Sequence, residues 1–197
     1  MDFLITLDQK LFLFLNGLHF SWLDGFMWWV STKTIWIPFY AALIFFMIWK
    51  RRKYWWITIL SIAIMILLSD QGADLIKDSV KRFRPTHTPA IETQVHVLTA
   101  PDGKVYRGGN YGFVSSHASN SFAVAVFVSL FFVRRWLTAL MFVWALIICY
   151  SRIYLGVHYP LDIICGATLG SLVGFGMFHL ERTVFRKVSS KSTNTYR

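Results

Sequence analysis

Charged side chains are scarce in this chain of 197 residues, where they make up 15% of the sequence, against about a quarter in an ordinary soluble domain. Hydrophobic residues make up 55% and aromatic residues 18%. This composition excludes a disordered chain and argues against a soluble globule. Acidic residues are the scarcest of the charged ones, because 10 Asp and Glu stand against 20 Lys and Arg, for a net charge of +10. The length suits a single domain over residues 1–197.

Cysteine is almost absent as well. Cys149 and Cys165 do not form a CxxC pair, so the sequence supports neither a disulfide framework nor a structural zinc site. Both lie in apolar stretches, where small buried side chains are expected. The sequence also lacks a carboxylate cluster of the kind that holds two metal ions. We therefore expect no metal and no cofactor.

Long apolar runs, in contrast, are plentiful. A membrane-spanning helix needs about 20 mostly apolar residues, and we predict an all-α integral-membrane bundle of five to six spanning helices. The polar end of the chain, residues 189–197, is expected to be a flexible tail. The five predicted spans are residues 28–49, 54–76, 119–133, 136–150 and 161–180.

The N-terminal segment, residues 1–20, has apolar residues at helical spacing that are interrupted by Asp2, Asp8 and Lys10. This pattern predicts an amphipathic helix at the membrane interface, with a sixth span as the alternative. The segment has no basic n-region, which argues against a cleaved signal peptide.

The basic residues indicate the orientation in the membrane. They gather at residues 50–53, at residues 134–135 and in the C-terminal tail. Because Lys and Arg concentrate in cytoplasmic loops, the C-terminus is predicted to be cytoplasmic. Residues 77–117 and 151–160 then face the periplasm or the exterior, as in a protein of the bacterial inner membrane. The whole excess of positive charge falls on the cytoplasmic side, so it needs no nucleic-acid partner.

Three outward-facing stretches carry polar residues that a membrane protein otherwise avoids. The first runs from Lys77 to Pro85. If the preceding helix continued, Lys77 and Arg84 would share a face and would repel each other unless an anion lay between them. Pro85 would then end the helix. The alternative is a basic helix end at the lipid headgroups, and the neighbouring Lys81 and Arg82 are also expected to contact headgroups or to mark the interface.

The second stretch, Val114-Ser115-Ser116-His117, directly precedes the third predicted span. A helix N-terminus offers free N–H groups and a positive dipole end that suit a phosphate. His117 can give or take a proton near neutral pH. The alternative is an ordinary Ser helix cap beside an interfacial histidine.

The third stretch contains Ser151, Arg152, His158 and Asp162. Arg152 has the forked donor geometry that suits phosphate oxygens. A carboxylate such as Asp162 can hold a nearby imidazole in one tautomer. A structural His–Asp hydrogen bond is the alternative, but all three stretches fall on the same predicted side of the membrane, which favours one shared site.

Together these stretches resemble the three signature motifs of the type 2 phosphatidic acid phosphatase superfamily. The second motif departs from the usual P-S-G-H, because Val114 replaces Pro and Ser116 replaces Gly, and a serine is less free to adopt a positive φ. The first motif, K-x6-R-P, is met by Lys77, Arg84 and Pro85, and the third, S-R-x5-H-x3-D, by Ser151, Arg152, His158 and Asp162.

The resemblance implies a metal-independent hydrolase that acts on a phosphomonoester or diphosphate of a membrane lipid through a phosphohistidine. It implies that His158 is the nucleophile, that Asp162 orients His158, and that His117 is the general acid and base. The implied phosphate-binding residues are Lys77, Arg84, Ser115, Ser116 and Arg152.

The partners implied are the lipid bilayer and a lipid phosphate. Undecaprenyl diphosphate, a phosphate of lipid A, and phosphatidate or phosphatidylglycerophosphate all fit. The alternative function is a membrane anion-binding or transport protein that uses the same cations without turnover. A vanadate-dependent haloperoxidase shares the motifs, but such relatives are soluble, and the apolar spans argue against it.

Overall fold

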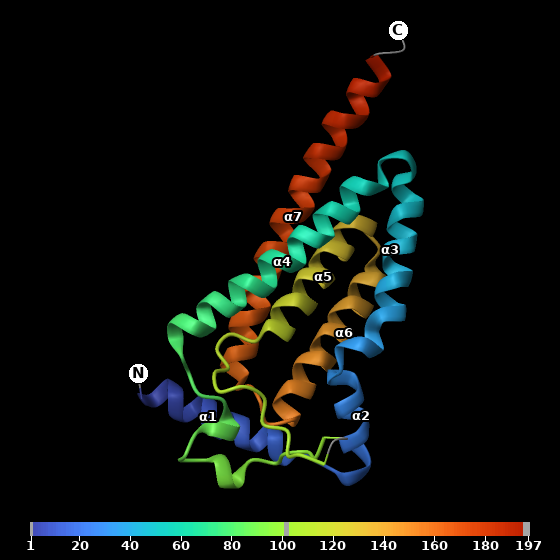
Figure 1. Cartoon of the computed structure of the whole chain (residues 1–197). Helices are drawn as coiled ribbons and strands as arrows, with labels where there is room; N and C mark the ends of the chain where they lie inside the picture. Colours follow the sequence, from blue (N-terminus) through green and yellow to red (C-terminus); the bar gives the residue numbers. More distant parts are fainter. Residues whose placement is uncertain (1, 101–102, 195–197) are drawn as a thin grey trace.

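The computed structural model describes residues 2–100 and 103–194, and this part of the chain is helical with no strand beyond two isolated β-bridges (Figure 1). Short 3-10 turns lie at Lys33–Trp36, Arg52–Tyr54, Pro85–His87 and Glu92–Gln94. The seven α-helices are α1 (Asp2–Gly17), α2 (Ser21–Ser31), α3 (Ile37–Arg51), α4 (Trp55–Val80), α5 (Ser116–Phe132), α6 (Arg135–Tyr154) and α7 (Pro160–Asn194).

Three helical segments are long and apolar enough to cross a membrane, namely Lys33–Val80, Arg135–Tyr154 and Pro160–Ser190. The first of them contains both α3 and α4, and Ser116–Phe132 is a shorter apolar helix. The prediction of an all-α membrane bundle is therefore confirmed. The number of crossings stays a prediction.

Two predicted boundaries differ from the structure. The segment 28–49 is not one helix, because α2 ends at Ser31 and α3 begins only at Ile37, with a proline in its first turn. Proline fits the start of a helix but not its interior, since it has no N–H to donate. At the other end α7 runs to Asn194, through most of the expected flexible tail, and residues 195–197 lie outside the described residues.

The main core is apolar and lies between α4, α5, α6 and α7. It contains fully buried or nearly buried side chains from each of these helices. Helices α5, α6 and α7 contribute its buried aromatic rings, and α3 closes one side. Members that define it are Met65, Phe127, Met141, Trp144 and Met177.

Helices α5 and α7 cross so closely that only glycine fits on the contact face of α7. A Cβ atom at Gly170 would lie 1.9 Å from the carbonyl oxygen of Ser119. Gly166 and Gly174, one turn to either side, would clash in the same way with the backbone of α5. Small residues at four-residue spacing allow two helix backbones to approach closely. This crossing sets the first turn of α7 against the first turn of α5.

The basic segments around α3 and α7 meet at the end of the bundle opposite the long loop (Figure 1). Lys50 Nζ donates a hydrogen bond of 2.8 Å to the carbonyl oxygen of Phe131. Arg51 forms a two-pronged ion pair of 2.7 and 2.9 Å with the fully buried Glu181, which also accepts a bond from Thr58. One end of the bundle is therefore basic.

Helix α1 lies across the other end of the bundle, beside the loop that joins α4 to α5 (Figure 1). Its buried face consists of Asp8, Phe12 and Asn16, which are spaced four residues apart. Its opposite face exposes large apolar side chains such as Phe3, at 77%, and Phe14, at 64%. A helix with this distribution suits a membrane interface.

Candidate active site

The loop between α6 and α7 carries His158, and the first turn of α7 carries Asp162. Both side chains are buried, with exposures of 2% and 0%. Oδ2 of Asp162 accepts a hydrogen bond of 2.9 Å from the backbone N–H of Tyr159, as a residue in the first turn of a helix commonly does. The same oxygen faces Nδ1 of His158 at 3.5 Å.

Arg84 contacts the other ring nitrogen of His158. Its Nη1 lies 3.3 Å from Nε2 of His158 and 3.0 Å from the carbonyl oxygen of Val157, and its Nε donates to the carbonyl oxygen of Tyr111 at 3.1 Å. A guanidinium can only donate, so Nε2 must accept and the proton of the neutral ring sits on Nδ1. This is the tautomer that leaves Nε2 free to attack an electrophile.

The electrostatic surroundings keep the His158 ring neutral. The pKa of His158 lies well below its usual value. Burial is the largest cause of this shift, and the charge of Arg84 is the next largest. Arg152 and Lys77 lower the same pKa further. Residues from the first and third predicted motifs therefore act on this one ring.

Arg84 does not share a helix with Lys77, contrary to the expectation from their spacing. Helix α4 ends at Val80, because Lys81 adopts a left-handed conformation with φ of 52°. The chain then runs extended, and the N–H of Arg84 donates to the carbonyl oxygen of Asn110 at 3.0 Å. Arg84 thus reaches His158 from the loop.

Lys77 lies at the end of α4 and faces the start of α5. Its Nζ contacts Asp74 Oδ1 at 2.6 Å and donates to Oγ of Ser116 at 3.1 Å. Lys77 and Asp74 lie three residues apart on α4, which places them on the same face of the helix. Lys77 and Ser116 are thereby brought together.

The second motif forms the N-terminus of α5. Ser115 is the N-cap and its Oγ accepts from the N–H of Ala118 at 3.4 Å, while its own N–H donates to the carbonyl oxygen of Asp162 at 3.1 Å. Ser116 is the first residue of α5 and is not among the residues with positive φ. The glycine usual at this position is therefore not required by the backbone here, contrary to the expectation from sequence.

Arg152 approaches from the end of α6 and is 4% exposed. Its Nη1 hydrogen-bonds to Ser31 Oγ, and its Nη2 donates to the hydroxyl of Tyr106 at 3.0 Å. The side chains of Arg152, Ser31, Tyr106 and His117 line a cavity of about 250 Å³. This cavity brings the predicted general acid together with a predicted phosphate ligand.

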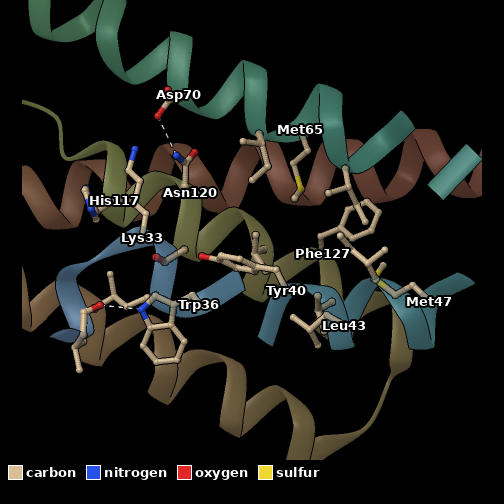
Figure 2. A pocket seen from close by; sticks show the side chains of 18 of the residues that line it. Lys33, Trp36, Tyr40, Leu43, Met47, Met65, Asp70, His117, Asn120 and Phe127 are labelled. Atoms are coloured by element: carbon tan, nitrogen blue, oxygen red, sulfur yellow. Dashed lines mark hydrogen bonds between the residues drawn. The ribbon is translucent and has the colours of Figure 1, made fainter. Parts of the chain in front are cut away.

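A larger cavity of about 390 Å³ begins at His117 and runs between α3, α4 and α5 (Figure 2). Lys33, Asp70 and Asn120 lie near the His117 end, as Figure 2 shows. Most of the remaining lining is apolar, and the far end is formed by side chains such as Met47 and Phe127. Polar groups at one end and apolar walls at the other suit an amphiphilic ligand.

Sequence reasoning missed three residues at this site. Arg82, expected at the headgroups, instead pairs with Asp162 at 2.8 Å and with Asp8 at 2.6 Å. Gly112 packs against Asp162 and His158. A Cβ atom at this position would lie 3.1 Å from Oδ2 of Asp162 and 3.6 Å from Nδ1 of His158. The third is Asp8, for which a signal was present in α1, because Asp8 and Asn16 interrupt the apolar helix on one face, eight residues apart.

The site as a whole has two connected parts. Arg84, His158 and Asp162 are in contact, whereas His117 and Arg152 meet across the smaller cavity. Across residues 2–100 and 103–194, no group of three or more His, Cys, Asp or Glu side chains is placed to hold a metal ion. The side chains available for chemistry are therefore two histidines, a carboxylate and a set of cations.

Comparison with known proteins identifies the family. The model of the PAP2 superfamily matches residues 54–186, which include all three motifs. The lipid A 4'-phosphatase of Bacteroides thetaiotaomicron is 33% identical over 96% of this chain and 84% of its own length. The lipid A 4'-phosphatase of Porphyromonas gingivalis is 34% identical over 88% of this chain and 72% of its own length.

A solved structure supports the fold. The PAP2-type phosphatidylglycerolphosphate phosphatase from Bacillus subtilis superposes with a TM-score of 0.72 at 20% identity, over 93% of this chain and 89% of that one. Because the relatives are phosphatases, an enzyme is confirmed over a binding or transport protein without turnover. The chain therefore belongs to the PAP2 superfamily, and it is an integral-membrane lipid phosphatase that hydrolyses phosphoric esters.

Proposed function

We propose that the protein removes a phosphate group from lipid A and that His158 carries this phosphate between the two steps of the reaction. The proposal rests mainly on the His158 ring, whose Nε2 is an acceptor toward Arg84 while Nδ1 faces Asp162. The names of the two relatives that match at 33% and 34% identity support the choice of lipid A.

In the first step Nε2 of His158 attacks the phosphorus atom. A P–N bond forms and the P–O bond to the lipid breaks, while His117, which takes up a proton when the phosphate anion binds beside it, donates this proton to the departing lipid oxygen. The imidazole, now phosphorylated on Nε2 and protonated on Nδ1, is positively charged. Asp162 stabilises this charge from the Nδ1 side.

In the second step water attacks the phosphohistidine. His117, which has lost its proton, accepts one from the water as the new P–O bond forms. The P–N bond breaks and its electron pair returns to Nε2, so His158 becomes neutral again. Inorganic phosphate leaves, and both histidines are back in their starting states.

The cations supply the remaining chemistry. Phosphoryl transfer depends mostly on positioning and on neutralising the charge of the phosphoryl oxygens. Lys77, Arg84 and Arg152 approach His158 from three segments of the chain and perform this neutralisation, with the hydroxyl of Ser116 beside Lys77. The hydroxyl of Ser115 caps α5, so Ser115 acts mainly by fixing the positive end of that helix toward the phosphate.

The larger cavity accounts for a lipid substrate. It adjoins His117 and has apolar walls between α3, α4 and α5, so one acyl chain lies in it while the phosphate is at His158.

In the membrane, the basic end of the bundle faces the cytoplasm and the catalytic end faces the periplasm. Fusing either a fluorescent protein or alkaline phosphatase to the C-terminus tests this orientation, because only the fluorescent fusion is expected to be active.

The decisive experiment is phosphate release by the purified protein in detergent with a chelator present. The panel consists of lipid A, undecaprenyl diphosphate, phosphatidylglycerophosphate and phosphatidate. We expect the highest kcat/KM for lipid A. The variant His158→Ala is expected to be inactive, whereas His179→Ala, which replaces an exposed histidine on α7, is expected to match the wild type.

A radiolabelled phosphate donor tests the intermediate directly. The wild type is expected to retain an acid-labile, alkali-stable label after rapid quenching, and His158→Ala to retain none. A higher kcat/KM for another lipid would overturn the proposal that lipid A is the substrate. Turnover without a covalent label on His158, or hydrolysis by His158→Ala, would overturn the mechanism.

A further inference from the structure

Arg82 lies between two buried carboxylates that come from distant parts of the chain. Its Nη1 contacts Oδ1 of Asp162 at 2.8 Å and its Nη2 contacts Oδ2 of Asp8 at 2.6 Å. Asp162 is 0% exposed and Asp8 is 7% exposed, so neither charge is balanced by bulk water. The guanidinium, 20% exposed, also lies over the ring of Tyr159 at 4.1 Å.

These contacts fix the rotation of the Asp162 carboxylate. Oδ1 is held by Arg82 and Oδ2 accepts the N–H of Tyr159 at 2.9 Å. With both oxygens held, Oδ2 remains directed at Nδ1 of His158, 3.5 Å away. A carboxylate that turned away would leave the buried Nδ1 without a counter-charge when the ring becomes positive.

Asp8 holds Arg82 in turn, and α1 is anchored so that Asp8 stays in place. Oδ1 of Asp8 accepts the N–H of Leu161, in the first turn of α7, at 2.9 Å. Two turns further along α1, Asn16 donates to the carbonyl oxygens of Ile153 and Tyr154 at 3.1 and 2.9 Å. Between them, Phe12 is fully buried. Both halves of α1 are thus attached to the segments that flank His158.

We propose that Asp8 and Arg82 are positioning residues for the phosphatase reaction, in which Asp8 holds Arg82 and Arg82 orients Asp162 toward His158. The N-terminal helix α1 is then part of the active site, although it lies outside the three motifs. This inference rests on the function proposed above. It assigns Arg82 to the orientation of the nucleophile and not to the substrate.

Steady-state kinetics on lipid A distinguish a role of Arg82 in orienting Asp162 from a role in binding the substrate. Arg82→Gln is expected to lower kcat by about 10- to 100-fold, as is typical when a group that orients a catalytic residue is lost, with little change in KM. Arg82→Lys keeps the charge but reaches one carboxylate at a time, so it is expected to recover part of kcat. Lys81→Gln, which removes the neighbouring exposed cation, is the matched control and is expected to leave kcat and KM unchanged.

A double-mutant cycle tests whether Asp8 acts through Arg82. Asp8→Asn alone is expected to lower kcat by about tenfold. In the Arg82→Gln background the same substitution is expected to lower kcat no further. If the double variant loses kcat by the product of the two single losses, Asp8 does not act on Asp162 through Arg82, and the proposal is overturned. A raised KM with unchanged kcat in Arg82→Gln would also overturn it, because Arg82 would then bind the substrate.

A second measurement does not depend on turnover. In ¹⁵N-histidine NMR spectra of the protein in detergent, the ring signals of His158, assigned with His158→Asn, are expected to shift in Arg82→Gln and Asp8→Asn but not in Lys81→Gln. Unchanged His158 signals would overturn the positioning roles. An inactive wild type whose His158 signals still respond to Arg82→Gln would overturn the proposed function and leave the positioning inference standing.

Discussion

Nη1 of Arg84 lies 3.3 Å from Nε2 of His158, so a cation predicted to bind phosphate sits directly against the predicted nucleophile. The donor on Arg84 requires a lone pair on Nε2, and the charge on Arg84 opposes protonation of the ring. This contact thus sets the tautomer of His158, and together with burial it keeps the ring neutral.

The first prediction concerns the pH at which His158 becomes protonated. Its pKa is held well below the usual value of 6.5, so the neutral ring is expected to persist as the pH falls through 6.5. Arg84→Gln removes the nearest cation and is expected to raise this pKa, because the protonated ring then meets less repulsion. Titration of the His158 ring signals by NMR measures both values, and a midpoint at or above 6.5 in the wild type would contradict the prediction.

The second prediction concerns the larger cavity. Leu43→Trp fills part of the apolar wall contributed by α3, so kcat/KM for lipid A is expected to fall by at least about tenfold. Hydrolysis of a water-soluble phosphate ester such as p-nitrophenyl phosphate is expected to be unaffected, since that substrate has no acyl chain. Leu172→Trp, on the exposed face of α7, is the control. Equal losses on both substrates in Leu43→Trp would show that the cavity does not hold the chain.

The third prediction concerns the crossing of α5 and α7. Gly170→Ala places a methyl group 1.9 Å from the carbonyl oxygen of Ser119, so the helices must separate, at an expected cost of about 3 kcal/mol. Gly176→Ala, on the same helix, meets nothing within 4 Å and is expected to be neutral. Thermal unfolding in detergent compares the two variants, and a similar Tm for both would refute the close contact.

The fourth prediction concerns the basic end of the bundle. Glu181→Gln leaves Arg51 without its buried counter-charge and is expected to destabilise the protein by about 3 kcal/mol. Glu92→Gln is the control, because Glu92 pairs with Arg107 at 3.9 Å on the surface, where an ion pair contributes little. Activity per folded molecule is expected to stay normal in both variants, since their partners, Arg51 and Arg107, are not among the predicted site residues. A Tm for Glu181→Gln equal to that of the control would contradict this prediction.

Much of the candidate site could be predicted from the sequence, because its residues lie in three short motifs whose internal spacing is local. His158 and Asp162 are four residues apart at a helix start, and Ser115 caps α5 as its position before an apolar run suggests. The all-α membrane architecture likewise follows from the apolar runs. These features depend on neighbours along the chain, which a sequence displays directly.

The parts that could not be predicted depend on tertiary contact. Arg82 lies in a basic run that resembles a headgroup-binding segment, and its partner Asp8 lies 74 residues away in the chain. The break in α4 at Lys81 also escaped prediction, since a lysine with positive φ leaves no mark in the sequence. Ser116 was expected to disturb the second motif, because it replaces a glycine. Its backbone is helical, however, and a serine in the first turn of a helix destabilises the helix little.

The glycine contact between α5 and α7 has a consequence for how this enzyme can diversify. Helices α5, α6 and α7 carry His117, Arg152 and Asp162, and the crossing at Gly170 holds α5 and α7 at a fixed separation. Side chains from α3, by contrast, line the larger cavity, and α3 carries none of the predicted site residues. Under the proposed function, α3 is therefore the wall of the chain-binding cavity that can vary most freely, and substitutions along it are expected to change chain selectivity without moving the reacting atoms.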